Sequence, residues 1–235
     1  MSKDICQNLD SLQQRISNAC EKAGRNPDEI TLVAVSKMKP LSNIKEAFGC
    51  GQLHFGENRA KELQEKMGEY GEEEIQWHMV GNLQTNKIKY IVDRVNWIHS
   101  ISKSKYLREI EKRASRIDRV VNTLVQINIS GEDQKSGCEA EQLPEILEYA
   151  QGLDHVRIHG LMGMASFVDP DEVEQVRPQF AMLRKLRDEH RKYETENVSL
   201  DELSMGMTND MEVAIEEGST MLRVGRAIFG ERNYT

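Results

Sequence analysis

Short apolar runs alternate with amphipathic segments along almost the whole chain. The clearest apolar run is residues 32–35, which is rich in β-branched side chains and predicts a strand covered on both faces. By the same pattern we expect further strands at residues 53–55, 75–80, 97–100, 121–129, 156–162, 198–203 and 221–224. The stretches between these runs carry apolar residues at helical spacing, so they predict helices.

For four of the predicted helices the sequence supports a statement about extent, ends or a possible kink. The first covers about residues 5–23, before any strand, and should stop at Gly24. Residues 84–92 are expected to be helical. A long helix spans about 173–186, where Pro178 is either an early-turn residue or a kink. Thr208 is the expected N-cap of the last full helix, which Gly218 ends.

The order of these elements predicts the fold class. One helix precedes about eight strand–helix units, and strands separated by helices form parallel βαβ units. About eight such units in 235 residues favour a closed barrel over an open sheet. We therefore expect an α/β fold, a single TIM-type (β/α)8 barrel with an extra N-terminal helix, with residues 1–235 forming one domain.

Composition narrows the function classes. The formal net charge is −8 with acidic and basic residues interspersed, which argues against a nucleic-acid-binding protein. No apolar run is long enough to span a bilayer, and the polar N-terminus has no signal-peptide core. A cytoplasmic protein without membrane contacts is expected.

The four cysteines are scattered, at positions 6, 20, 50 and 138, without any CxxC pair. This spacing suggests neither a metal site nor a disulfide framework, so we expect small buried or half-buried side chains.

The first predicted strand ends in a polar pair, Ser36 and Lys37. Ligands of parallel α/β folds bind at the carboxyl ends of the strands. A lysine beside an apolar wall is partly desolvated there, which lowers its pKa and makes the amine a nucleophile for carbonyl compounds. The alternative for Lys37 alone is a solvated lysine before the turn at Pro40.

Two late stretches predict an anion site. The small residues Ser204 and Gly206 open a predicted helix, and Gly225 with Arg226 follows the last strand. Barrels frequently bind phosphate in the loops after strands seven and eight. Taken alone, these stretches are also consistent with a capped turn and a tight turn. Together with Lys37 they predict a Schiff base between the lysine and a phosphorylated carbonyl compound.

Six motifs in order along nearly the whole chain make the prediction more specific. The sequence resembles the pyridoxal 5′-phosphate homeostasis protein family (YggS/PROSC type), which is related to the N-terminal barrel domain of alanine racemase. The motifs are Val33-Ala-Val-Ser-Lys37-Met-Lys-Pro40, Phe55-Gly-Glu-Asn58, Trp77-His78-Met-Val-Gly81-Asn-Leu-Gln84-Thr-Asn86-Lys87, His159-Gly160-Leu-Met162, Ser204-Met-Gly-Met207 and Arg223-Val-Gly-Arg-Ala-Ile-Phe-Gly230.

This resemblance implies pyridoxal 5′-phosphate (PLP) as cofactor, bound as a Schiff base on the first-strand lysine. The implied cofactor-binding residues are Lys37, Asn58, Ser204, Met205, Thr208, Arg223, Gly225 and Arg226. Asn58 would line the site near the ring, and Ser204, Gly225 and Arg226 would hold the phosphate with Met205 and Thr208 nearby. Arg223 would face the ring nitrogen and, being permanently charged, keep it unprotonated. No catalytic residue and no metal ligand is expected.

Three other residues have two interpretations each. His78 and His159 end strands and could line the barrel mouth, but a hydrogen-bonded structural role is the favoured prediction. Lys135 could be a second amine that passes the cofactor on, although a solvated loop lysine is favoured.

The expected function is intracellular vitamin B6 homeostasis: buffering or delivering PLP without robust catalysis. Apo forms of PLP-dependent enzymes are the candidate partners, and a monomer is expected. One alternative is a PLP-dependent amino-acid racemase of alanine racemase type, with weak activity of that kind left open. Such racemases add a C-terminal β-domain carrying a catalytic tyrosine, for which no sequence is seen before Thr235. A Schiff-base aldolase acting on sugar phosphates is a third hypothesis.

Overall fold

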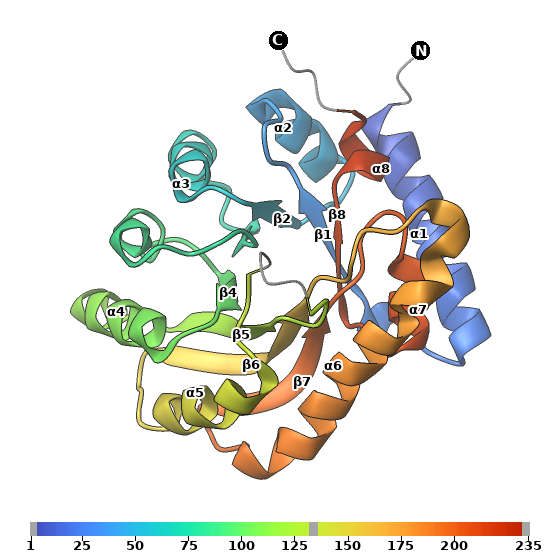
Figure 1. Ribbon diagram of the computed structural model, residues 1–235. Coiled ribbons are helices and arrows are strands. Elements are labelled where there is room, and N and C mark those ends of the chain that lie inside the picture. The colour runs from blue at the N-terminus through green and yellow to red at the C-terminus, as the bar shows by residue number, and fades with distance from the viewer. Residues whose placement is uncertain (1–3, 132–135, 232–235) are drawn as a thin grey trace.

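The computed structural model describes residues 4–131 and 136–231 (Figure 1). Within these ranges, eight parallel strands pair in sequence order and close into a barrel, because β8 pairs with β1. The strands are β1 (Thr31–Val35), β2 (His54–Glu57), β3 (Gln76–Met79), β4 (Trp97–Ile101), β5 (Val121–Ile127), β6 (Val156–Gly163), β7 (Val198–Ser204) and β8 (Met221–Val224). The predicted TIM-type barrel is therefore confirmed.

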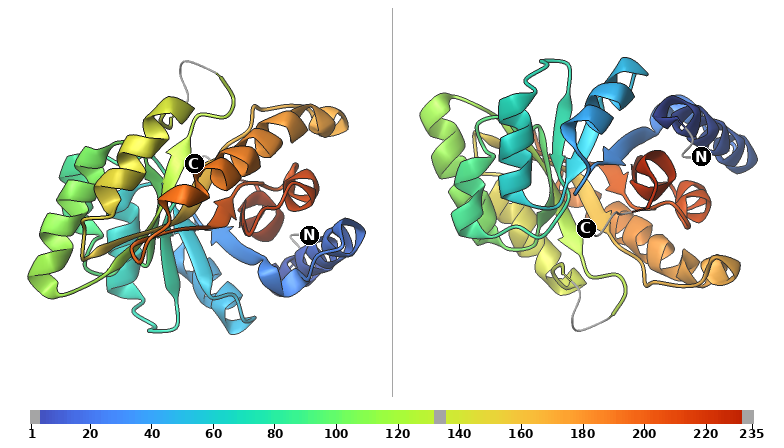
Figure 2. Two further views of the ribbon diagram at one scale, coloured as in Figure 1. Left: turned by 90° about the horizontal axis from the view of Figure 1, so that it is seen from below. Right: turned by 90° about the horizontal axis from the view of Figure 1, so that it is seen from above.

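Helices surround the barrel on its outside, as the views along the barrel and from the side make clear (Figures 1 and 2). They are α1 (Ile5–Ala23), α2 (Leu41–Gly49), α3 (Ala60–Glu69), α4 (Ser104–Ala114), α5 (Leu143–Ala150), α6 (Arg177–His190), α7 (Met211–Glu216) and α8 (Arg226–Phe229). Short 3₁₀ turns occupy Pro27–Glu29, Thr85–Tyr90, Ser115–Ile117, Ala140–Gln142, Pro170–Val176 and Arg191–Tyr193. No helix of the described residues is long and apolar enough to cross a membrane.

The predicted extra helix is α1, which lies beside α7 and α8 (Figure 1). One face of α1 is buried, and it carries the apolar residues at helical spacing: Ile5, Leu9, Leu12, Ile16, Ala19 and Cys20. Gly24 ends the helix in the left-handed conformation, at φ 66°, as its position after the last apolar residue predicts. Asn8 donates a hydrogen bond to the Ile228 carbonyl of α8, at 2.9 Å.

Local details of three predicted helices differ from or refine the expectation. The helix expected at 84–92 is instead a 3₁₀ helix, Thr85–Tyr90, which buries Ile88. Pro178 lies in the first turn of α6, so the kink is ruled out. The prediction that Thr208 is the N-cap of the last full helix is wrong. That helix, α7, starts after Asp210, whose Oδ1 accepts the Met207 N–H at 2.5 Å.

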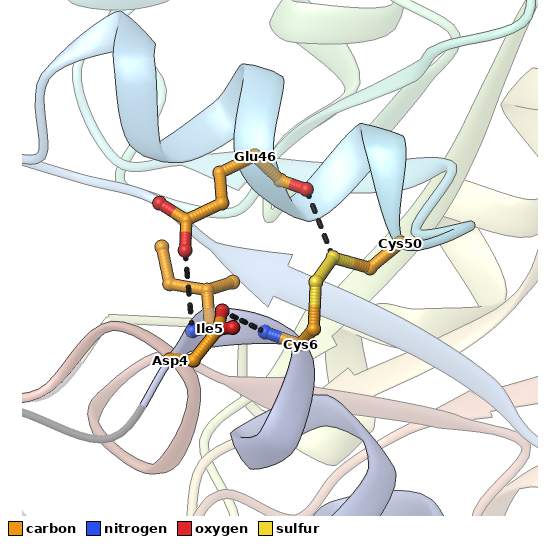
Figure 3. The surroundings of a disulfide bond; sticks show 5 residues. All are labelled: Asp4, Ile5, Cys6, Glu46 and Cys50. Atoms are coloured by element: carbon orange, nitrogen blue, oxygen red, sulfur yellow. Dashed lines mark hydrogen bonds between the residues drawn. A yellow bond between two sulfur atoms is a disulfide. The ribbon is translucent and has the colours of Figure 1, made fainter.

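The expectation of unpaired cysteines is wrong for two of the four. Cys6 and Cys50 form a disulfide, with Cα atoms 5.6 Å apart, whereas Cys20 and Cys138 are buried thiols. Figure 3 shows the bridge joining the first turn of α1 to the residue after α2. The same helices are joined by the Ile5 N–H, which donates to Glu46 Oε1 at 3.3 Å. The pairing depends on how the two helices pack, and cysteine spacing does not reveal that.

Barrel closure brings the two ends of the sequence together. Val33 and Ala34 of β1 lie opposite Arg223 and Val224 of β8. Directly after these pairs, a Cβ on Gly225 would come within 2.8 Å of the Val35 carbonyl oxygen. Glycine is therefore needed for the close approach of the two strand ends, and the segments that follow them meet at the carboxyl-terminal side of the barrel.

Candidate functional site

A cavity of about 480 Å³ opens at the carboxyl ends of the strands, a size typical of small-molecule sites. Its wall includes six of the eight predicted site residues: Lys37, Asn58, Thr208, Arg223, Gly225 and Arg226. These residues come from the ends of β1, β2, β7 and β8. The structure thus brings together residues that lie up to 189 positions apart, from Lys37 to Arg226 (226 − 37 = 189).

Two lysines from the loop after β1 line the cavity, and their surroundings differ. Lys37 is half-buried, two residues after the end of β1. Lys39 donates its amine to two backbone carbonyls at the end of α8, those of Phe229 at 2.8 Å and Glu231 at 2.7 Å. Lys39 therefore fastens the loop to α8, which makes it a structural counterpart to Lys37 in the same cavity.

Asn58 contributes an amide to the wall directly after β2. Its Oδ1 is buried and has no hydrogen-bond partner among the described residues. An unpaired buried acceptor costs on the order of 1–3 kcal/mol, so a ligand with a donor group would relieve this cost. The backbone of Asn58 is closely packed, because a Cβ at Gly81 would come within 2.2 Å of the Asn58 carbonyl oxygen.

Of the residues predicted to bind or adjoin the phosphate, Gly225, Arg226 and Thr208 line the cavity, whereas Ser204 and Met205 do not. Arg226 is exposed, and its Nε lies 3.8 Å from Glu231 Oε1, a long ion pair that solvent weakens. Because α8 has four residues and α7 has six, their helix dipoles are small. Any anion held here would depend on individual N–H groups and the Arg226 guanidinium rather than on a long helix.

Arg223 is the buried cation of the site. It is 5% exposed, and its Nη1 and Nη2 donate to Ser204 Oγ at 2.7 Å and to the Gly163 carbonyl at 2.9 Å. Burial lowers the pKa of Arg223 to about 10, with Asp210 opposing the shift, so the guanidinium stays charged at neutral pH. Two fixed hydrogen bonds hold its plane, and its remaining surface faces the cavity.

The hydrogen bonds of Arg223 continue across the barrel interior through three histidines. His99 Nδ1 lies 2.9 Å from Ser204 Oγ, His99 Nε2 lies 2.8 Å from His78 Nδ1, and His78 Nε2 lies 3.0 Å from His54 Nδ1. Because Arg223 can only donate, Ser204 Oγ accepts from it, and the Ser204 O–H can donate a hydrogen bond to His99 Nδ1. One consistent assignment then has Nε2–H on every ring, each donating to the next.

The three histidines of this hydrogen-bonded series all have lowered pKa values, which favours their neutral forms. Burial lowers the pKa of His54, and it lowers the pKa values of His78 and His99 well below their usual range. The neighbouring positive charges add to the effect, notably Arg223 for His99. Protonating either buried ring would break the donor–acceptor alternation and place a second cation near Arg223.

Acidification is therefore expected to destabilise the protein through His78 and His99. Their folded pKa values are depressed, so below pH 6.5 the unfolded chain binds protons that the folded chain excludes. Stability present above pH 6.5 is lost as the pH falls, by about 1.4 kcal/mol per pH unit for each ring.

Urea unfolding between pH 7.5 and 5.5 measures this effect. In the variant His99→Gln, the slope of the unfolding free energy against pH should fall by the contribution of about one proton. Glu57 acts with the opposite sign, because burial raises its pKa to about 7 and its contribution is lost as pH rises through that value. That contribution is common to the wild type and the variant, so an unaltered slope in His99→Gln would refute the assignment.

The remaining candidate residues lie elsewhere. Ser204 is fully buried, contacts Arg223 and His99, and does not line the cavity. Met205 belongs to the hydrophobic core. His78 and His159 are both hydrogen-bonded and neither lines the cavity, as the favoured structural role predicts. Lys135 lies outside the described residues. Among the described residues, no group of histidine, cysteine and acidic side chains could hold a metal ion.

Sequence reasoning missed one side of the cavity. The segment after β6 contributes Met164, Ser166, Phe167, Val168 and Asp169, and Asp210 adds a carboxylate from before α7. Phe167 is 83% exposed at this edge. The only signal in the sequence was that this segment follows a predicted strand, and strand position alone does not say which loop residues turn toward the cavity.

The fold and the position of the cavity define the class of this protein: a (β/α)8 barrel with a small-molecule cavity at the carboxyl ends of its strands. The family model described as "Alanine racemase, N-terminal domain" matches residues 7–233 of this chain. An alanine racemase of Clostridium difficile superposes with a TM-score of 0.76 at 15% identity, over 98% of this chain and 57% of that one. At that identity the likeness concerns the fold alone.

Closer relatives specify the family. The pyridoxal phosphate homeostasis proteins of Aquifex aeolicus and Escherichia coli K12 are 43% and 39% identical, over 98% and 99% of this chain and 100% and 98% of their own lengths. The chain belongs to the pyridoxal phosphate homeostasis protein family. PipY of Synechococcus elongatus, solved with PLP bound, has a TM-score of 0.80 at 31% identity, over 96% of this chain and all of that one.

Proposed function

We propose that this protein binds PLP in the cavity, as a Schiff base on Lys37, and buffers or delivers it for intracellular vitamin B6 homeostasis. The observation that carries the proposal is that β1–β8 pairing gathers Lys37, Arg223, Gly225 and Arg226 around one cavity. The names of the relatives, and the PLP bound to PipY, support the same cofactor.

The residues of the cavity fit a phosphorylated pyridine aldehyde. Arg226 offers positive charge for a phosphate at the exposed end of the cavity, and Arg223 offers a buried charge further in. Asn58 offers a buried amide oxygen that lacks a partner within the described part of the chain. We assign the phosphate to Gly225, Arg226 and Thr208. Ser204 contributes by accepting a hydrogen bond from Arg223, and Met205 contributes by packing in the hydrophobic core.

Lys37 and Arg223 have different roles in this proposal. PLP supplies an aldehyde that condenses with a primary amine and a ring that can withdraw electrons. Lys37 supplies the amine, presented by the end of β1. Arg223 is oriented by hydrogen bonds to Ser204 and the Gly163 carbonyl, and we place its permanent positive charge next to the ring nitrogen. This charge disfavours protonation of that nitrogen. The ring is then a weak electron sink, which suits storage more than turnover.

The composition of the cavity wall also favours binding over racemisation. Racemisation by two bases needs a second acid–base group across the cofactor from the lysine. Among the described wall residues there is no tyrosine, histidine or cysteine; the other groups that can exchange protons are Lys39, which is bonded to two carbonyls, and the carboxylates of Asp169, Asp210 and Glu231. We therefore propose a protein without robust catalysis, and the alanine racemase type of reaction remains the alternative to be tested.

Further parts of the proposal concern organisation. We infer that the chain acts as a single cofactor-binding domain, as a monomer, in the cytoplasm, with apo forms of PLP-dependent enzymes as acceptors. The Cys6–Cys50 disulfide bears on the location, because such bonds are uncommon in reducing compartments outside hyperthermophiles. Alkylation of the thiols in intact cells, followed by mass spectrometry, would measure what fraction of the pair is oxidised there.

A direct test uses purified protein saturated with PLP and then dialysed. We expect visible absorbance and about one equivalent of PLP to be retained, since a lysine Schiff base with a held phosphate dissociates slowly. Added to an apo PLP-dependent enzyme, the loaded protein should restore its activity, with free PLP at the same concentration as the control. Protein that is colourless after dialysis would refute binding. Racemisation of alanine well above the rate in buffer would favour the alternative function.

A further inference from the structure

Three ionisable side chains, two glutamates and a lysine, lie under the loop that carries Lys37. Lys66 of α3 donates to Glu57 Oε1 at 2.6 Å, to Glu62 Oε1 at 2.8 Å and to the Ser36 carbonyl at 2.9 Å. The side chains of Lys66 and Glu57 are 10% and 0% exposed, and that of Glu62 is 20% exposed. The Glu57–Lys66–Glu62 cluster is therefore a largely desolvated hydrogen-bond network of ionisable side chains, and none of its members lines the cavity within the described residues.

This cluster holds the backbone on both sides of Lys37. On one side, Ser36 Oγ donates to Glu57 Oε1 at 2.6 Å while the Ser36 carbonyl accepts from Lys66. On the other side, the Met38 N–H donates to Glu62 Oε1 at 2.6 Å. Hydrogen bonds to ionised groups are about twice as strong as neutral ones, so the two residues next to Lys37 are held firmly.

Met38 shows why the loop needs such support. Its φ is 60°, in the left-handed region that a residue with a side chain rarely adopts. Its side chain is 49% exposed, so core packing does not account for the conformation. A backbone held in such a region persists only where surrounding contacts specify it, and the Glu62 carboxylate provides the contact at this residue.

The Glu62 carboxylate that accepts the Met38 N–H stays ionised. Burial acts to raise its pKa, but hydrogen bonds from Lys66 and the Met38 N–H outweigh burial and hold the pKa below its usual value. Glu62 therefore remains ionised at neutral pH and keeps accepting from Met38.

We propose that Glu57, Lys66 and Glu62 are positioning residues that hold Ser36 and Met38 in place and thereby aim the Lys37 amine into the cavity. The cluster acts through the backbone and does not touch the bound molecule. This inference rests on the proposed function for its cofactor readout, whereas the backbone readout is independent of it.

The key variant is Glu62→Ala, which removes the acceptor of the Met38 N–H. Two measurements apply to the protein without cofactor: hydrogen exchange of the Met38 amide, and the rate of reductive methylation of Lys37 by formaldehyde, read by peptide mass spectrometry. A third measures the rate at which Lys37 captures PLP. Misplacing a reacting group by about 1 Å can cost on the order of 100-fold, so we expect PLP capture to slow by about 10- to 100-fold. Exchange at Met38 should accelerate by a similar factor.

Three further variants separate positioning from general stability. Glu62→Gln keeps an oxygen acceptor for Met38 and should recover most of the capture rate. Glu65→Ala removes another, exposed glutamate of α3 and should match the wild type. Met38→Gly, combined with Glu62→Ala, should recover part of the rate, because glycine adopts a positive φ without cost.

The results distinguish the two levels of the proposal. Capture and exchange that are both unchanged in Glu62→Ala would overturn the positioning role. Equal losses in Glu62→Ala and Glu65→Ala would overturn it too, since the effect would not depend on the loop. If the wild type captures no PLP at Lys37, the proposed function fails, while accelerated Met38 exchange and altered formaldehyde labelling in Glu62→Ala would still uphold the backbone role.

Discussion

Replacement of Lys37 by alanine is expected to abolish the visible absorbance of the PLP-loaded protein. Lys37 is the amine that we propose for the covalent link, and the anchoring groups at Gly225 and Arg226 remain in the variant. Affinity should therefore fall without vanishing, by an amount on the order of 100-fold, or about 3 kcal/mol. The fold should persist, because a half-buried lysine after a strand end contributes little to the core.

Lys39 offers the matched control for this experiment. It lines the same cavity from the same loop, but its amine is engaged with the Phe229 and Glu231 carbonyls. Lys39→Ala should keep the absorbance and lose some stability instead. Borohydride reduction of the wild type, followed by peptide mapping, should place the cofactor mass on Lys37. Mass found on Lys39, on Lys135 or on no lysine would contradict the central assignment.

Removing the Cys6–Cys50 disulfide is expected to produce the largest loss of stability among the changes considered. The bridge closes a loop with a sequence separation of 44 residues. The loop-entropy relation gives about 4 kcal/mol for a ring of this length, through the freedom that the unfolded chain regains. Urea unfolding of the double variant Cys6→Ser, Cys50→Ser should show this loss.

Reductant provides the internal control for the disulfide. Dithiothreitol should lower the unfolding midpoint of the wild type toward that of the double variant, and should leave the double variant unchanged. The free thiols Cys20 and Cys138 are present in both proteins, so their chemistry cancels. Identical midpoints for the wild type with and without reductant would show that the bridge does not contribute.

The strands and the cavity wall were predictable because they depend on local pattern. The apolar run before Lys37 and the small residues around Gly225 each report a position within one strand or one turn. The parallel barrel then brings strand ends together by topology alone, which is why six predicted residues share a wall. The phosphate role predicted for Ser204 stays a prediction; what the sequence did not indicate is that its hydroxyl contacts Arg223 of the neighbouring strand β8.

The features that escaped prediction all depend on contacts between distant elements. His54, His78 and His99 each lie in a different strand, and their chain of hydrogen bonds requires knowing which side of each strand faces inward. Cys6 and Cys50 pair because α1 lies next to α2. The cluster under Lys37 depends on the turn between β2 and α3. Such contacts follow from side-chain direction and packing, which hydrophobic periodicity does not specify.

Closure of the barrel between its first and last strands has a consequence for synthesis of the protein. Lys37 leaves the ribosome 188 residues before Gly225 (225 − 37 = 188), yet both line the same cavity. A nascent chain that lacks β8 and the residues after it exposes one edge of β1 and lacks Gly225 and Arg226, two of the residues that we propose for the phosphate. Under the proposed mode of binding, PLP would therefore select molecules whose barrel has closed over nascent or truncated chains. PLP that binds on release from the ribosome would serve as a final check on folding.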